Sequence, residues 1–335
     1  MSDFVMGILY SVLQEKLDKF RADGLSDSEI VDKISELKIE EALGKLTEAM
    51  SSDTVDTMKN TMYERVMEEQ SKAEQFMEHN REIWGNGFVA SEVMYLIALE
   101  AGSYINAYAR TLPEEQYKDK MYRYCVLGEL YGRACQQYLE IIYLVKGGFA
   151  DGAYARWRSL FELSVISEFI RKNREKVAKA YFDDLDGEKG YHNWAKASPG
   201  IAKKLRKENR ENVNFSDIKS KCSIATKAWN NEYKLANKVV HATPQGTFDR
   251  LGMPSGPRDF TPVGHSDYGL APPAVNAALS LSSIAADYFG LAQSGESIVY
   301  TRVLTKWASL IREYYTEIEA KCFNEQENSV LQKNQ

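Results

Sequence analysis

The sequence predicts an all-α protein, built as a long antiparallel helical bundle with an N-terminal helical extension. Only 8 prolines occur in 335 residues, and six of them fall between residues 244 and 273, so the rest of the chain is nearly free of the residue that breaks helices. Elsewhere, apolar residues recur at three- and four-residue steps, which is the spacing of one helix face. Hydrophobic residues make up 44% of the chain. This is enough apolar surface for a packed core, and it excludes wholesale disorder.

Residues 1–85 form the predicted extension, a series of amphipathic helices. The sequence SDSE at Ser26–Glu29 has the form of a capping box and predicts a helix start. A longer helix is expected after Asp53 and is expected to end at Gly85. Residues 1–84 contain 10 basic and 19 acidic side chains, a net charge of −9. The extension is therefore expected to be a strongly acidic helical segment.

Residues 86–322 form the predicted bundle. Two long apolar helices are expected between Gly87 and Gly148, with a break near Pro113. The apolar face of the second helix is too broad for a surface helix, so we expect this helix to be central. A helix over Asp151–Lys172 follows, and then shorter helical pieces.

The segment 243–271 interrupts the helical pattern because it is rich in proline and glycine. A connection of this length inside a compact helical domain is typical of a lid, a binding loop or a disordered segment, and its aromatic and aliphatic residues argue against pure disorder. Two more helices, beginning at Pro272 and near Glu296, close the bundle. Residues 323–335 are polar and are predicted to form a flexible tail.

Composition and motifs exclude several classes of protein. The four cysteines show no CxxC spacing, and the start of the chain lacks a basic secretory signal, so we expect a cytoplasmic protein. No run approaches eighteen apolar residues, so no membrane association is expected. The four histidines match no zinc spacing, and the chain has no P-loop or Rossmann glycine pattern. No metal and no cofactor are therefore expected.

The candidate site residues are Arg158, Glu162 and His241. Arg158 and Glu162 stand four residues apart in a mostly apolar helix and therefore share a face. They could form a structural ion pair, or they could serve a site. His241 ends a predicted helix where the loop 243–271 begins, and it could cap that helix or act as a general acid or base beside Arg158 and Glu162. We expect the three side chains to meet in one site.

Two surface patterns have more than one interpretation. A polar stripe formed by Glu129, Arg133, Gln136 and Glu140 either faces solvent or meets Arg158 and Glu162 across a helix interface in a buried network.

The segment 203–227 is basic: residues 200–227 hold eight basic and three acidic side chains. It could contact RNA phosphates, bind the acidic extension of another copy, or form a solvated face.

The chain resembles a family of bacterial all-helical proteins of unknown function over Glu82–Tyr288. The resemblance rests on EIWGNGFVASEVMYLIALE, on YLVKGGFADGAYARWRSLFELSV with Arg158 and Glu162, and on NKVVHATPQG with His241. It implies an arginine, a glutamate and a histidine on neighbouring helices. In outline the arrangement is also similar to the helical, metal-independent ribonucleases of the HEPN class. Those proteins usually carry an arginine shortly before the histidine, where this chain has Asn237 and Lys238.

Two functions follow as hypotheses. The first is a helical effector or adaptor of a bacterial defence or stress system that acts through contacts with a protein partner. The second is a metal-independent ribonuclease that uses His241 with Arg158 and Glu162, in which the histidine serves as base and the arginine stabilises the phosphate. The acidic extension, the basic segment 203–227 and the apolar helices also predict a homo-oligomer, most simply a two-fold dimer.

Overall fold

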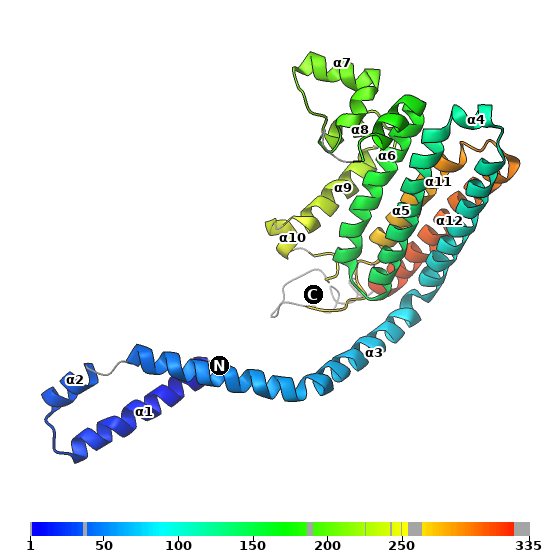
Figure 1. Cartoon of the computed structure of the whole chain (residues 1–335). Helices are drawn as coiled ribbons and strands as arrows, with labels where there is room; N and C mark the ends of the chain where they lie inside the picture. The colour runs from blue at the N-terminus through cyan, green and yellow to red at the C-terminus, as the bar shows by residue number, and fades with distance from the viewer. Residues whose placement is uncertain are drawn as a thin grey trace, which may run out of the picture. The chain divides into compact units, whose positions relative to one another are not determined.

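The structure is a computed structural model that describes residues 2–35, 39–185, 190–224, 226–241, 243–248, 250–253 and 263–324. Every secondary-structure element within these residues is helical (Figure 1). The prediction of an all-α fold with packed antiparallel helices is therefore confirmed. The chain divides into two compact units, Met1–Lys72 and Ala73–Gln335.

The unit Met1–Lys72 contains α1 (Ser2–Ala22), α2 (Asp27–Ser35) and the first part of α3 (Ile39–Thr111). The predicted helix start at Ser26 is present. Glu29 Oε2 accepts hydrogen bonds from the backbone N–H of Ser26 at 2.9 Å and from the Ser26 hydroxyl at 2.6 Å. The glutamate thus reaches back to the residue before α2, as a capping box requires.

The expectation that a helix ends at Gly85 is wrong, because α3 continues without a break to Thr111. A glycine inside a helix costs about 1 kcal/mol relative to alanine, which packing can offset. Gly87 is packed closely against another helix: a Cβ at this position would lie 2.9 Å from Cε2 of Tyr315. The glycine therefore permits close helix contact and does not end the helix.

The bundle of the larger unit contains α3 from residue 73 onward, together with four long helices that run side by side (Figure 1). A short turn at Gly147–Gly148 reverses the chain, and Gly148 has a φ of 74° that favours glycine. The four helices are α5 (Met121–Lys146), α6 (Ala150–Phe182), α11 (Ala271–Phe289) and α12 (Gly295–Glu319).

Smaller helices complete this unit, and three of them, η1, α8 and α9, pack on α6. Glu168 of α6 accepts hydrogen bonds from the backbone N–H groups of Ser223 at 2.8 Å and Ile224 at 3.0 Å, so it fixes the segment before α9. The smaller helices are α4 (Glu114–Lys118), η1 (Asn193–Ala197), α7 (Pro199–Glu208), α8 (Phe215–Lys219), α9 (Lys227–Val240), α10 (Pro244–Phe248) and the π-helical turn η2 (Ala320–Asn324).

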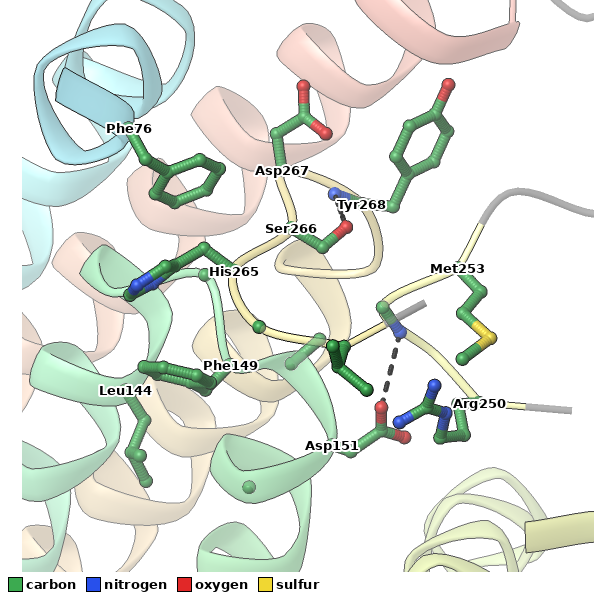
Figure 2. A pocket seen from close by; sticks show the side chains of 16 residues that line it. Phe76, Leu144, Phe149, Asp151, Arg250, Met253, His265, Ser266, Asp267 and Tyr268 are labelled. Atoms are coloured by element: carbon green, nitrogen blue, oxygen red, sulfur yellow. Dashed lines mark hydrogen bonds between the residues drawn. The ribbon is translucent and has the colours of Figure 1, made fainter. Parts of the chain in front are cut away.

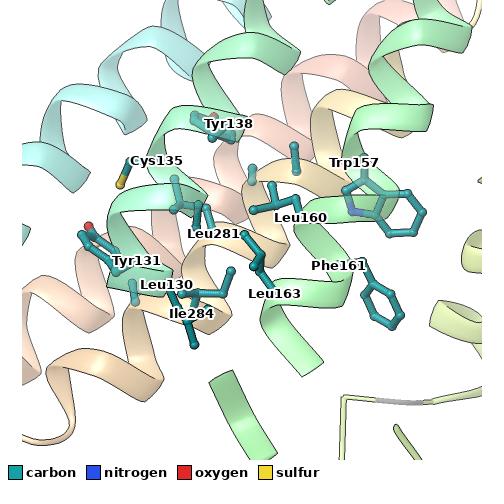
Figure 3. Close-up of a cluster of buried hydrophobic side chains, with 14 of the residues drawn as sticks. Leu130, Tyr131, Cys135, Tyr138, Trp157, Leu160, Phe161, Leu163, Leu281 and Ile284 are labelled. Atoms are coloured by element: carbon teal, nitrogen blue, oxygen red, sulfur yellow. The ribbon is translucent and has the colours of Figure 1, made fainter. Parts of the chain in front are cut away.

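The core lies between α5, α6 and α11, and the prediction that α5 is central is confirmed. Figure 3 shows side chains from these three helices meeting in one cluster. The hydroxyl of Tyr131 donates a 2.6 Å hydrogen bond to the carbonyl oxygen of Ala98, which ties α5 to α3. Buried members of the cluster are Leu130, Tyr131, Cys135, Tyr138, Trp157, Leu160, Phe161, Leu163, Leu281 and Ile284.

The helical path of α6 is interrupted at Arg174, whose φ of 60° and ψ of −154° are not helical. The interruption falls just after the predicted helix end at Lys172. The side chain of Asn173 bridges the break, because its Nδ2 donates to the carbonyl oxygen of Phe169 at 2.8 Å and its Oδ1 accepts from Ser198 at 2.6 Å. Hydrogen bonds from the Asn173 side chain thus stabilise the backbone at the kink.

One expectation about α3 needs correction, and two others fall partly or wholly outside the described residues. By length and composition alone, the helix Leu43–Thr111 contains an 18-residue stretch apolar enough to cross a membrane. The expectation that no segment of the chain is apolar enough to span a membrane therefore does not hold for α3. Of that stretch, 44% is buried inside the fold. Part of the segment 243–271, at 249 and 254–262, lies outside the described residues, and so does the predicted tail from residue 325 onward.

Candidate functional site

An aromatic stack joins α6 to α9 and supports the candidate site. Helix α9 begins at a capped end, where the hydroxyl of Thr226 accepts from the backbone N–H of Trp229 at 3.4 Å. Trp229 then stacks on Phe161 with ring centroids 5.5 Å apart, and on Trp157 at 5.9 Å. Tyr233, one turn further along α9, contacts Phe161 at 5.3 Å. These contacts hold α9 against the face of α6 that bears the candidate residues.

The expected ion pair between Arg158 and Glu162 is present on that face. Nε of Arg158 lies 3.3 Å from Oε1 of Glu162, and the two side chains are 27% and 33% exposed. The hydroxyl of Tyr233 donates a 2.7 Å hydrogen bond to the same carboxylate oxygen. Burial, together with this bond to Glu162, raises the pKa of Tyr233 to about 12. Glu162 is therefore shared by a cation on its own helix and a hydroxyl on α9.

Two further titratable residues, distant in sequence, join this cluster. The ammonium group of Lys219 lies 4.7 Å from the centre of the Tyr233 ring, a cation–π distance. Burial lowers the pKa of Lys219, and repulsion from Lys234 lowers it further. Burial also lowers the pKa of His192, while the charge of Glu162 acts in the opposite direction. The imidazole under the electrostatic influence of Glu162 is thus that of His192.

His241 lies at the C-terminal end of α9 with an exposed side chain. Among the described residues, no hydrogen bond or ion pair joins its imidazole to Arg158 or Glu162. Its neighbour Val240, however, lines a surface depression together with both of those residues. A contact between the three side chains stays a prediction, and so does a catalytic role for any of them.

Three of the four residues of the polar stripe on α5 face solvent, in line with the first of its two interpretations. Glu129, Arg133 and Gln136 are exposed. Glu140 pairs with Arg156 of α6, not with Arg158 or Glu162, and also accepts a 3.2 Å hydrogen bond from Gln136.

Part of the basic segment 203–227 is structural. Lys204 and Arg210 both bind the buried carboxylate of Asp217, at 2.6 and 2.8 Å. The bond from Arg210 is the largest cause that holds the pKa of Asp217 well below its usual range. The exposed cations of this segment are Lys203, Arg206, Lys207, Lys221 and Lys227.

A cavity lies near the Gly147–Gly148 turn, and the residues that line it hold the described parts of the segment 243–271 in place. Figure 2 shows His265 between Phe76 and Phe149, with ring centroids 5.1 and 4.9 Å away. Nδ1 of His265 lies 2.6 Å from the carbonyl oxygen of Gly147, which can only accept, so this nitrogen carries the hydrogen. Asp151 accepts a 3.0 Å hydrogen bond from the backbone N–H of Leu251. These contacts anchor the segment to α3, to the turn between α5 and α6, and to α6 itself.

Within the described part of the chain, no group of three or more histidine, cysteine, aspartate or glutamate side chains could hold a metal ion. The arrangement around Glu162 instead offers cations, one hydroxyl and one imidazole. Such a set can bind an anion through Arg158 and Lys219, and it can exchange a proton at His192.

Comparison with known proteins gives one family match. No curated protein and no solved structure matches the chain. Residues 124–257, which include Arg158, Glu162 and Tyr233, match the model of a family of unknown function (DUF5677).

Proposed function

We propose that the protein is a helical interaction protein, an effector or adaptor that acts through protein contacts and self-associates through α3. The proposal is supported by an uncovered apolar stripe on the part of α3 that belongs to the unit Met1–Lys72. Val55, Met58, Met62 and Val66 are each between 47% and 54% exposed. They follow one another at three- and four-residue steps, so they lie along one face of the helix. A continuous exposed stripe of this kind is typical of a helix that pairs with another helix.

The partner that fits this stripe best is a second copy of the chain. Glu69 continues the line of the stripe, and Lys59 flanks it. In an antiparallel pairing centred at Glu64, Met62 of one copy lies level with Val66 of the other. Lys59 then lies level with Glu69 of the other copy, so that the charge within the stripe meets an opposite charge. Because the same surface serves both copies, the contact is two-fold and closed.

The mass of the full-length chain in solution tests this proposal. Light scattering after size-exclusion chromatography should give a dimer for the wild type and a monomer for Met58→Glu/Met62→Glu. The control Thr57→Glu/Asn60→Glu adds the same charge on the opposite face of α3 and should remain dimeric. Lys59→Glu should weaken the dimer, and adding Glu69→Lys should restore it. A monomeric wild type at all protein concentrations would contradict the proposal, and a charge swap that fails to restore the dimer would contradict the orientation.

A second candidate is RNA binding or metal-independent cleavage, with His241, Arg158 and Glu162 as the site proposed from the sequence. The specific observation in its favour is the gathering of Arg158, Lys219 and Lys234 near Tyr233, because phosphates are bound mainly by such cations. In this version the general base is an imidazole at the edge of the cluster, either His241 or His192.

Labelled single-stranded RNA incubated with the protein in excess chelator tests the second candidate. Cleavage should be lost in Arg158→Ala and in the histidine variant that removes the base, either His241→Ala or His192→Ala. Binding should weaken steeply with salt. The absence of both binding and cleavage at low salt would contradict this candidate. The link to a bacterial defence or stress system stays a prediction from the sequence.

A further inference from the structure

A second cavity lies at the end of the bundle where α3, α4, α5 and α11 meet. Its volume is about 580 Å³, which is within the range of small-molecule sites. All of its lining residues belong to the unit Ala73–Gln335 and are described by the structure. Those on which the inference rests are Asn106, Arg110, Tyr117, Tyr124, Glu129 and Tyr288.

One of the residues that line the cavity has a buried hydroxyl that lacks a partner. The side chain of Tyr124 is 5% exposed, and its hydroxyl oxygen makes no hydrogen bond within the described part of the chain. The neighbouring Tyr288 is different, because its hydroxyl donates to Oδ1 of Asn106. Buried polar groups in folded proteins are almost always paired. The unpaired hydroxyl of Tyr124 has almost no surface open to water as the ring stands, so a ligand group completes its hydrogen bonding only after the ring turns toward the cavity.

The cavity also offers one unpaired group of each charge. Arg110, near the end of α3, and Glu129, on α5, form no ion pair or hydrogen bond with any described residue. The other acidic lining residue, Glu114, is already paired with Lys118 at 2.7 Å. A guanidinium group is suited to a carboxylate, and a carboxylate is suited to an ammonium group.

The remaining walls are aromatic. The rings of Tyr117 and Tyr124 stack with centroids 6.1 Å apart, and Tyr288 lines the same space. Rings arranged in this way favour a flat apolar body, which gains from stacking and edge contacts.

We propose that this cavity binds a small zwitterion with a flat apolar body, the chemistry of an aromatic α-amino acid. Arg110 holds the carboxylate, Glu129 holds the ammonium group, and the hydroxyl of Tyr124 pairs with a polar atom of the ligand. The three tyrosine rings enclose the side chain. The site is independent of the α3 stripe, so its occupation does not rest on the proposed self-association.

Calorimetric titration of the full-length protein with three probes tests the proposal. L-phenylalanine carries both charges, 3-phenylpropionate lacks the amine, and 2-phenylethylamine lacks the carboxylate. L-phenylalanine should bind with a Kd of about 1 mM or tighter. Each analogue should bind about two- to fivefold more weakly, because it loses one ion pair with an exposed side chain of the site.

Variants assign the contacts. Arg110→Gln should weaken L-phenylalanine and 3-phenylpropionate but not 2-phenylethylamine, and Glu129→Gln should show the reverse pattern. Tyr124→Phe should leave the melting temperature of the free protein unchanged or raise it, since it removes an unpaired buried hydroxyl, and should weaken L-phenylalanine. The exposed Glu82→Gln is the control and should change nothing.

Three results would overturn the proposal. One is the absence of heat from all three probes at about 1 mM. Another is equal affinity for all three, which would indicate an apolar cavity that recognises neither charged group. The third is a drop in the melting temperature of free Tyr124→Phe without any change in binding, which would show that the hydroxyl has a structural partner. A Met58→Glu/Met62→Glu protein that still binds L-phenylalanine as wild type would confirm that the cavity acts independently of the α3 stripe, and loss of binding there would contradict that independence.

Discussion

Replacing Glu168 by glutamine should destabilise the larger unit in a pH-dependent way. The side chain of Glu168 is 5% exposed and binds Lys172 at 2.6 Å, in addition to Ser223 and Ile224. Burial alone would raise the pKa of Glu168. The hydrogen bonds from Lys172, Ser223 and Ile224 outweigh it and lower the pKa from 4.5 to about 2.

The magnitude follows from that difference in pKa. A carboxylate whose pKa falls from 4.5 to about 2 on folding contributes about 3 kcal/mol to the free energy of unfolding at pH 7. Because the pKa is lowered in the folded state, this contribution is complete above about pH 4.5 and declines as the pH falls toward 2. At pH 3 it should be about 1 kcal/mol. Glu168→Gln should therefore cost about 3 kcal/mol at pH 7, or about 6–12 °C in Tm, and distinctly less at pH 3.

Urea unfolding followed by circular dichroism at both pH values measures this difference. The exposed Glu82→Gln serves as the matched control and should lie within about 0.5 kcal/mol of wild type at either pH. A loss of stability in Glu168→Gln that is equal at pH 7 and pH 3 would refute the reasoning, because it would show that the charge of Glu168 is not what holds the segment before α9.

Two further predictions concern packing and the candidate site. Gly102→Ala should lower the free energy of unfolding by about 1–3 kcal/mol, because its Cβ would lie 2.7 Å from the ring of Tyr131. Gly132→Ala should raise it by about 0.5–1 kcal/mol, because nothing lies within 4 Å of the added Cβ. Thermal unfolding of the two variants checks both signs. Glu162→Ala should cost about 1 kcal/mol, since the ion pair is partly exposed, and His241→Ala should change stability by less than about 0.5 kcal/mol. A loss of several kcal/mol in His241→Ala would show that this exposed imidazole has a structural role.

The helical fold could be predicted because each helix is marked by the spacing of residues within its own stretch of sequence. Apolar residues at helical spacing define each helix, and the end of one helix near Lys172 matches the non-helical backbone at Arg174. The continuity of α3 could not be predicted in this way. Whether Gly85 or Gly87 ends a helix depends on what packs there, and the contact of Gly87 with Tyr315 is between residues far apart in the chain.

The same distinction applies to the candidate site. The pairing of Arg158 with Glu162 follows from their four-residue spacing. Tyr233, Lys219 and His192 come from separate helices and turns, so no spacing rule places them near Glu162. One available signal was the four-residue step from Trp229 to Tyr233, which marks an aromatic face of α9 directed at α6. Lys219 and His192 gave no such signal.

The aromatic stack between α6 and α9 also gives the protein an intrinsic optical reporter. Trp157 is fully buried and its indole N–H donates to Ser280 at 3.1 Å, whereas Trp229 is only partly buried and depends on the docking of α9 for its surroundings. Detachment of α9 would hydrate Trp229 and the face of Trp157 on which it stacks, and would shift their emission to longer wavelength while the indole N–H of Trp157 stayed bonded to Ser280. Fluorescence can thus follow the local release of α9 separately from global unfolding.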